Sequence, residues 1–142
     1  MFMINYNMNK FLKEIHKNYL IIYKQNNQYF VVDHFVYLFK SLFQFNFLIK
    51  NNRKIILIDE CYINYILKKL RENNISYVVI HINYGYDILL KYKTTNNQYK
   101  NYYQQGKNII KNENKINYLI KLLETKRNIN LLQKIESVIQ NG

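Results

Sequence analysis

Carboxylate side chains are the first place in this sequence to look for chemistry, because paired acids can hold the metal ions that nucleases use. Asp59 and Glu60 come directly after an apolar run at residues 55–58, and Glu113 with Lys115 repeats the acid-x-Lys part of a nuclease pattern. The second pair falls in a helical tail instead of on a neighbouring strand, so capping of a helix by Asp59 is the simpler role. A metal-dependent nuclease is our third hypothesis, and we expect a protein that is not an enzyme.

The other reactive side chains form no catalytic or metal-binding pattern. His16, His34 and His81 lie far apart, and no Cys-x-x-Cys or His-x-x-x-His spacing occurs. Cys61 is the only cysteine and has no basic neighbour in the sequence to activate it. Gly106 stands alone, so a glycine-rich phosphate loop is missing. We therefore expect no catalytic residue, no bound metal and no cofactor.

Charge gives the clearest indication of a partner. The chain carries a net charge of +12 from 21 basic and 9 acidic residues, which favours binding to polyanions. The residues that AT-rich codons specify are also abundant, so a merely solvated basic surface is the alternative. Only three residues are arginine, which argues against dense bidentate recognition of guanine. The sequence has no signal-like or membrane-spanning apolar run, and we expect a soluble, cytoplasmic protein.

The spacing of apolar residues predicts an α/β (α+β) fold, in which a mixed β-sheet is flanked by helices. Asp33 is expected to cap the second helix and Asp59 the third, which should end at Asn73-Asn74. Polar links between strands predict two hairpins, and the third helix should connect two parallel strands by a right-handed crossover. Helices are predicted over residues 7–17, 35–43 and 60–72, and strands over residues 19–24, 28–32, 45–49, 54–58 and 77–80.

The chain is expected to form a single domain, residues 1–142, because it has no proline and only three glycines that could mark a linker. A mixed α/β core should span residues 8–82 and a mainly helical extension residues 83–142. Residues 87–93 fit either a short helix or a strand. Two apolar stripes, separated near Arg127-Asn128, predict a C-terminal helical hairpin. The stripes are Ile116, Leu119, Ile120 and Leu123, followed by Leu131, Leu132, Ile135, Val138 and Ile139.

Residues 9–82 resemble the N-terminal mismatch-recognition domain of the DNA mismatch repair protein MutS. Residues 65–74, Tyr-Ile-Leu-Lys-Lys-Leu-Arg-Glu-Asn-Asn, are similar to a helix of that family, and residues 20–32 are similar to the strand and hairpin before its Gly-x-Phe-Tyr-Glu segment. The resemblance implies a mixed sheet and binding of mismatched DNA, with Tyr29 at the position of the segment's tyrosine. Gln28 and Phe30 replace the family's base-stacking phenylalanine and its glutamate, and the Gly-hydrophobic-Pro turn before the helix is missing.

Two hypotheses of different kinds follow. The first is a non-catalytic DNA-binding protein in DNA repair or mobile-element DNA maintenance, in which lysines contact phosphates and an aromatic side chain at the first hairpin stacks on an unpaired base. A core position is the alternative for that aromatic. The second is a protein-interaction adaptor that forms a homodimer or binds a partner through its C-terminal helices. The predicted DNA-binding residues are Lys24, Tyr29, Phe30, Lys50, Lys54, Lys68 and Lys69.

Overall fold

A computed structural model describes the backbone of residues 4–141 and the side chains of residues 4–130 and 133. The chain divides into two compact units, residues 1–107 and 108–142. The helices are α1 (Tyr6–Ile15), α2 (Phe35–Phe43), the short 3-10 helix η1 (Glu60–Tyr62), α3 (Ile63–Glu72) and α4 (Tyr99–Asn141). The strands are β1 (Leu20–Gln25), β2 (Gln28–Val32), β3 (Leu48–Lys50), β4 (Arg53–Ile58), β5 (Tyr77–Ile82) and β6 (Tyr86–Tyr92).

The strands form one six-stranded mixed sheet in the order β3-β4-β2-β1-β5-β6. Only β1 and β5 pair in parallel, and all other neighbours are antiparallel. The α/β (α+β) prediction is confirmed. β4 and β5 run in the same direction, as predicted, but β2 and β1 lie between them. Residues 86–92 form an edge strand, which settles the choice between helix and strand for this segment.

Asparagine residues make the tight connections between strands. Asn51 and Asn52 join β3 to β4 with φ values of 52° and 61°, and Asn26 joins β1 to β2 with φ of 56°. In the β3-β4 hairpin, positive φ at both central residues matches the right-handed twist of a two-residue hairpin, and asparagine tolerates that region better than most residues. Both predicted hairpins are confirmed. Asn74, with φ of 56°, follows α3 at the predicted end of that helix.

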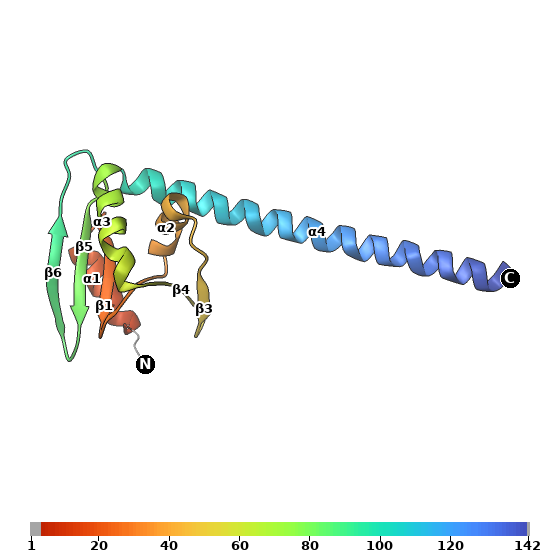
Figure 1. Ribbon diagram of the computed structural model, residues 1–142, viewed down its shortest axis with the longest axis horizontal. Helices are drawn as coiled ribbons and strands as arrows, with labels where there is room; N and C mark the ends of the chain where they lie inside the picture. The colour runs from red at the N-terminus through yellow and green to blue at the C-terminus, as the bar shows by residue number, and fades with distance from the viewer. Residues whose placement is uncertain (1–3, 142) are drawn as a thin grey trace. The chain divides into compact units, whose positions relative to one another are not determined.

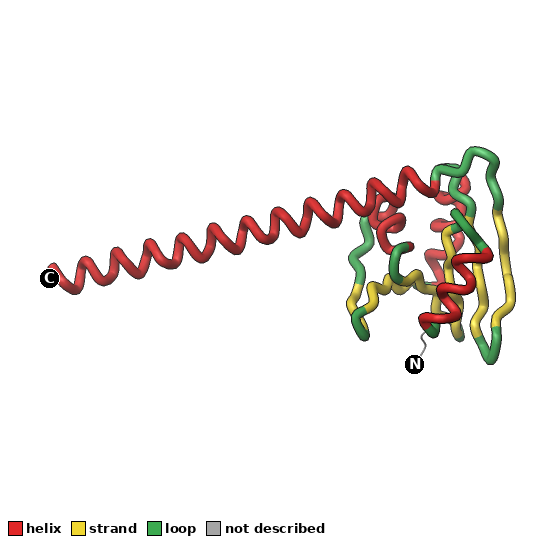
Figure 2. The backbone as a smooth tube through the Cα atoms, turned by 180° about the vertical axis from the view of Figure 1, so that it is seen from behind, coloured by secondary structure: helices red, strands yellow, loops and turns green. Residues whose placement is uncertain are grey.

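Helices cover the sheet on both faces. Tyr23 on β1 donates a hydrogen bond to Asn9 of α1, whereas Tyr77 on β5 accepts one from Arg71 of α3. The register pairs Tyr77 with Leu20, three residues from Tyr23, so these two tyrosines lie on opposite faces. Figure 1 shows α2 and α3 in front of the strands, and the reverse view in Figure 2 brings α1 forward. The middle strands β1 and β5 are therefore buried on both sides.

The buried side of α1 differs from the apolar stripe in the sequence. Leu12 is buried as expected, but Phe11 and Ile15 are about half exposed, while Asn9 and His16 are buried. Asn9, Leu12 and His16 recur at helical spacing, so α1 is rotated toward its polar residues. The reason is that Asn9 finds hydrogen-bond partners in the core, which removes the usual cost of burying an amide.

Both predicted aspartate caps are wrong. His34 occupies the N-cap position of α2, and Asp33 before it adopts φ of 57° and directs its carboxylate to Arg53 and Asn9. Asp59 occupies the N-cap position of η1, and its side chain makes no capping hydrogen bond. In the second case the backbone itself closes the turn, because the amide of Tyr62 donates to the carbonyl of Asp59.

The predicted C-terminal helical hairpin is also wrong, because α4 is a single helix from Tyr99 to Asn141. No glycine or proline stands near Arg127-Asn128, and asparagine alone costs a helix only a few tenths of a kcal/mol relative to its neighbours, about 0.7 at most. The stripe predicted at Leu131, Leu132, Ile135, Val138 and Ile139 lies among side chains outside the described set. Within the first unit, α4 begins beside α2, where the rings of Tyr37 and Tyr103 meet edge-on with centres 5.7 Å apart.

Gly106 allows this part of α4 to approach α2 closely. A β-carbon at Gly106 would overlap the backbone carbonyl of Tyr37. The obstacle is backbone, which cannot move aside as the end of a side chain can. Gly106 is therefore a packing residue, although it stands without companions in the sequence.

We expect Gly106→Ala to destabilise the first unit by about 1–3 kcal/mol, because overpacking outweighs the roughly 1 kcal/mol that alanine adds to a helix. The measurement is the free energy of unfolding in urea. Gln105→Ala, on the exposed side of the same turn, is the control and should leave stability within about 0.5 kcal/mol. An equal or higher stability of Gly106→Ala would contradict the close contact.

Candidate nucleic-acid interface

The predicted DNA-binding residues do not form one surface. Lys24 and Tyr29 pair across the β1-β2 hairpin, and the Lys24 ammonium lies 5.3 Å from the centre of the Tyr29 ring. The register puts Tyr29 opposite Ile58, four residues along β4 from Lys54. Four residues of a strand span about 13 Å, so Lys24 and Lys54 lie toward opposite ends of the sheet. Lys50 pairs with Arg53, the neighbour of Lys54, so Lys50 and Lys54 point to opposite faces.

Phe30 is wrong as a DNA-stacking residue, because its side chain is completely buried. It packs against Tyr23, with ring centres 5.5 Å apart. The alternation of side chains along β2 explains the difference: Phe30 points into the α1 side of the sheet, while half-buried Tyr29 points to the other face. Of the two aromatics at this hairpin, only Tyr29 reaches solvent.

The two lysines of α3 are already engaged with their own helix and its neighbour. Lys68 is exposed and lies 3.9 Å from Glu72 one turn later. The Lys69 ammonium lies 5.4 Å from the ring centre of Phe43 and 6.0 Å from that of Tyr65. Lys68 matches the prediction of a solvent-facing lysine, whereas Lys69 is only partly exposed and its ammonium lies over aromatic rings.

Lys54 instead belongs to a concave basic site that we call the basic pocket. The pocket has a volume of about 410 Å³ and lies between α1, the start of α2 and the β3-β4 hairpin. Three lysines line it: Lys10 and Lys13 from α1, and Lys54 from β4. Within the described part of the chain, none of the three has a carboxylate within ion-pair distance. The complete lining is Tyr6, Asn9, Lys10, Lys13, Asp33, His34, Tyr37, Asn52 and Lys54.

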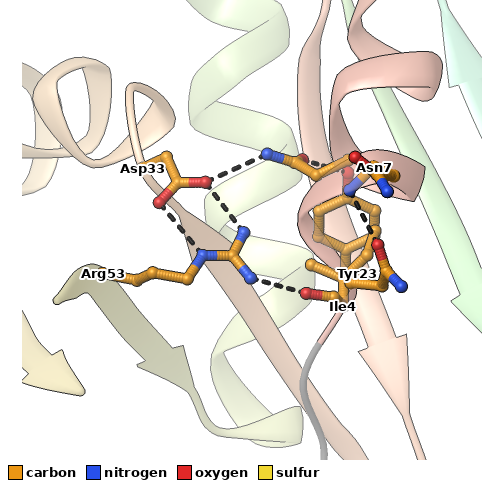
Figure 3. Close-up of polar contacts among 7 residues, drawn as sticks. Ile4, Asn7, Tyr23, Asp33 and Arg53 are labelled. Carbon is orange, nitrogen blue, oxygen red and sulfur yellow. Dashed lines mark hydrogen bonds and ion pairs between the residues drawn. The ribbon is translucent and has the colours of Figure 1, made fainter. Parts of the chain in front are cut away.

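Asp33, the only acid in the lining, forms an ion pair with Arg53, which is not itself part of the lining. The Arg53 guanidinium approaches both carboxylate oxygens, with Nη2–Oδ2 at 2.8 Å and Nε–Oδ1 at 3.3 Å. The amide of Asn9 also donates to Asp33 Oδ2, at 3.0 Å, and Arg53 donates to the carbonyl of Ile4 (Figure 3). This pair is only about one-fifth exposed, and the Arg53 charge offsets that of Asp33, although Asp33 still acts on Lys13 and His34.

A buried tyrosine completes this network. The Tyr23 hydroxyl donates to Asn9 Oδ1 at 2.5 Å, and burial raises the pKa of Tyr23, so the hydroxyl keeps its proton. Asn9 thus receives one hydrogen bond and gives another, which fixes the direction of its amide. The network holds α1 against β1 and the end of β2, and through them sets the position of Lys10 and Lys13.

The pKa shifts in the pocket reflect burial and crowded positive charge. Burial lowers the pKa of Lys13, an effect that Asp33 opposes. The pKa of His34 is lowered by burial first and then by Lys13, Lys54 and Lys107, while Asp33 pulls it upward. His34 is therefore a neutral hydrogen-bonding group at pH 7, and the lysines carry the positive charge.

The lysines of α1 were missed in the sequence. Lys10 and Lys13 are three residues apart, which puts them on one side of a helix, and that spacing was the available signal. Their approach to Lys54, more than forty residues away, depends on the side of α1 that faces the sheet. The rotation of α1 around Asn9 decides this.

The other reactive residues remain dispersed. Asp59, Glu60 and Cys61 are exposed, and Glu113 belongs to the second unit. Among the described residues, no three His, Cys, Asp or Glu side chains lie close enough together to hold a metal ion. In that same part of the chain, no helix is both long and apolar enough to cross a membrane.

Comparison of the sequence with models of known protein families gives no match, and comparison with curated proteins gives none either.

The two aromatics at the first hairpin should respond differently to truncation. We expect Phe30→Ala to lower the free energy of unfolding by about 3–5 kcal/mol, because it removes a completely buried ring. Tyr29→Ala, at a half-buried position, is the matched comparison and should cost clearly less. Urea unfolding of both variants measures the difference. Similar losses would contradict the assignment of Phe30 to the core and Tyr29 to the surface.

We expect His34 to titrate below pH 6.5, and Lys13→Gln to raise its pKa by removing a neighbouring positive charge. The imidazole proton shifts in an NMR titration report both values, and Lys100→Gln, an exposed exchange outside the pocket, is the control. Unfolded His34 binds its proton at higher pH than folded His34. This group therefore contributes a loss of stability as the pH falls through 6.5 toward the lowered pKa. An unchanged His34 pKa in Lys13→Gln would contradict the proposed charge crowding.

Proposed function

We propose that this protein is a non-catalytic DNA-binding protein that contacts phosphates through the basic pocket. One observation carries the proposal: Lys10, Lys13 and Lys54 converge in a concavity whose only carboxylate is paired with Arg53. Unpaired cations held close together repel one another, and an anion relieves that repulsion. Phosphate oxygens are the common anions that accept several ammonium hydrogen bonds at once.

The charge of the whole chain supports the same conclusion. A net charge of +12 attracts nucleic acid over a range of about one Debye length, near 10 Å at 0.1 M salt. Lysine gives this attraction without the planar fork that reads guanine, so binding should depend weakly on sequence. We place the protein in the cytoplasm as part of this proposal, with DNA as its partner and no cofactor.

The resemblance to the MutS mismatch-recognition domain gives a more specific version of the proposal, with a role in DNA repair or mobile-element DNA maintenance. Tyr29 is then the residue that would stack on an unpaired base, since the ring of Phe30 is covered. The Lys24 ammonium beside the Tyr29 ring adds a positive charge where the backbone of a displaced strand would pass. Mismatch preference would thus depend on Tyr29, and general affinity on the lysines.

Salt dependence tests the proposal directly. The affinity of the parent protein for a duplex should fall steeply as salt rises from about 50 mM. In a plot of the logarithm of the binding constant against the logarithm of the salt concentration, each phosphate contact that is removed should reduce the steepness of the slope by about 0.9. The double variant Lys10→Glu, Lys13→Glu should flatten this slope by the amount expected for the loss of about two phosphate contacts. The same exchange at Lys68 and Lys69 should have a smaller effect, because Glu72 and the aromatic rings already engage these lysines.

Fluorescence anisotropy with matched and mismatched duplexes measures these slopes, and circular dichroism checks that each variant is folded. Tyr29→Ala should reduce preference for a mismatch without changing the salt slope. The absence of salt-sensitive binding by the parent protein near 50 mM salt would refute the DNA-binding proposal.

The second unit favours a second candidate function, self-association as an interaction adaptor. Ile116, Ile120 and Leu123 recur along one side of α4, and their side chains are 56%, 47% and 67% exposed. A helix rarely keeps such a stripe in water without burying it, since most helical stability comes from packing of the apolar side. We choose a second copy of this chain as the partner, because two identical stripes are complementary in length and chemistry.

Sedimentation equilibrium tests self-association. The parent protein should form a dimer whose dissociation constant changes little with salt, because its interface is apolar. Ile120→Lys should weaken it by at least tenfold by burying an unpaired charge. Thr125→Lys adds the same charge about 140° around the helix from Ile120 and about 180° from Ile116, and should leave the dimer intact. A monomeric parent protein would refute self-association through α4.

A further inference from the structure

We infer that the basic pocket binds a terminal phosphomonoester of mononucleotide size, either free or at the end of a DNA strand. The strand-end form rests on the proposed DNA-binding function, whereas the free form does not.

The charge of the pocket favours a phosphomonoester over a phosphodiester. Lys10, Lys13 and Lys54 supply three positive charges, Arg53 and Asp33 neutralise each other, and the lowered pKa keeps His34 neutral at pH 7. A phosphodiester inside a strand carries one negative charge, but a phosphomonoester carries about −1.5 to −2 at pH 7. The dianion matches the crowded lysines better, and it offers three unesterified oxygens to three ammonium groups.

The way in which the lysines are held favours the same ligand. Lys10 and Lys13 come from one turn of α1, and Lys54 approaches from β4, where its ammonium lies 5.4 Å from the centre of the Tyr37 ring. The Tyr37 ring is itself fixed by the edge of Tyr103, at 5.7 Å between centres. The positive groups therefore line one cavity from separate elements, and a ligand in that cavity would lie among them.

The size and lining of the pocket favour a nucleotide. Its volume of about 410 Å³ falls in the usual range for small-molecule sites, roughly 300–1,000 Å³, and inorganic phosphate alone would leave most of it empty. Tyr6 and Tyr37 line the space beside the lysines, and tyrosine rings stack on bases of any identity. Asn52, an exposed residue of the lining, adds an amide group that can hydrogen-bond a sugar or a base edge. A nucleoside attached to the phosphate would use these groups.

A concave site also selects a strand end over the middle of a duplex. In continuous B-DNA the phosphates follow the outside of a rod, with a duplex continuing on both sides of each one. A phosphate inside a concavity lined by α1, α2 and the β3-β4 hairpin is reached more readily by a strand end than by a duplex that continues on both sides. A terminal nucleotide provides such an end.

The experiment compares short single-stranded DNA that differs only at its end. Oligonucleotides of one sequence carry a 5′-phosphate, a 3′-phosphate or hydroxyls at both ends, and their affinities are measured by anisotropy at a fixed 0.1 M salt. Thymidine monophosphate and thymidine are measured alongside by NMR titration of the His34 and Tyr37 rings. We expect one phosphorylated end to bind about tenfold tighter than the hydroxyl form, or thymidine monophosphate to bind where thymidine does not.

Two pocket variants and one control locate the effect. Lys13→Gln and Lys54→Gln each remove one pocket charge and should abolish the preference for the phosphorylated ligand. Lys100→Gln removes one exposed charge outside the pocket lining and should retain it. If a pocket variant fails to fold, the shifts of the His34 and Tyr37 rings in the parent protein still report whether the phosphate enters the pocket.

The outcomes separate this inference from the proposed function. Thymidine monophosphate bound without any DNA binding supports a free nucleotide as the ligand and refutes the DNA-binding proposal. Salt-sensitive DNA binding with equal affinity for all three ends, and no response to thymidine monophosphate, overturns the phosphomonoester inference and leaves DNA binding intact. Loss of the preference in Lys100→Gln as well as in the pocket variants would overturn the assignment to the pocket.

Discussion

The contact between Arg53 and Asp33 is the interaction on which the rest of this site depends. Asp33 stands at the end of β2 in a left-handed conformation, where the chain leaves the sheet and turns into α2. Arg53 begins β4, and its guanidinium reaches Asp33 and the carbonyl of Ile4, just before α1. One ion pair thus joins a strand end, a strand start and the entry to a helix. Removal of either partner would be costly, because it would leave the other charge partly buried without a counter-charge.

Asn9 extends this contact into the core. An amide on the buried side of a helix is unfavourable unless both its donor and its acceptor are used, and Tyr23 and Asp33 use them. The consequence reaches the surface, because turning Asn9 inward leaves Phe11 and Ile15 half exposed and brings Lys10 and Lys13 to the pocket. A structural network therefore determines where the positive charge of α1 is presented. The arrangement also explains why a pocket that contains an aspartate can still be basic.

Local signals in the sequence accounted for much of the first unit. Asparagine pairs marked the turns, β-branched runs marked the strands β4 and β5, and the spacing of Ile63, Ile66 and Leu70 marked α3. These signals depend on contacts within a few residues, and for that reason they are readable without tertiary structure. The helical hairpin failed for a related reason. A gap in an apolar stripe can mean a change of partner as easily as a break in the backbone, and only a true helix breaker tells the two apart.

The sequence by itself determined the basic charge, the mixed sheet, both hairpins and the end of α3, because composition and short-range periodicity specify them. Tertiary structure alone decided that Phe30 is core and Tyr29 is surface, that Gly106 lies against the carbonyl of Tyr37, and that Lys54 belongs with two lysines of α1. Each of these depends on which side of an element faces the sheet. Long-range packing and the hydrogen bonds of Asn9 and Asp33 decide which side faces the sheet. These contacts join residues far apart in the sequence, so no local sequence pattern indicates them.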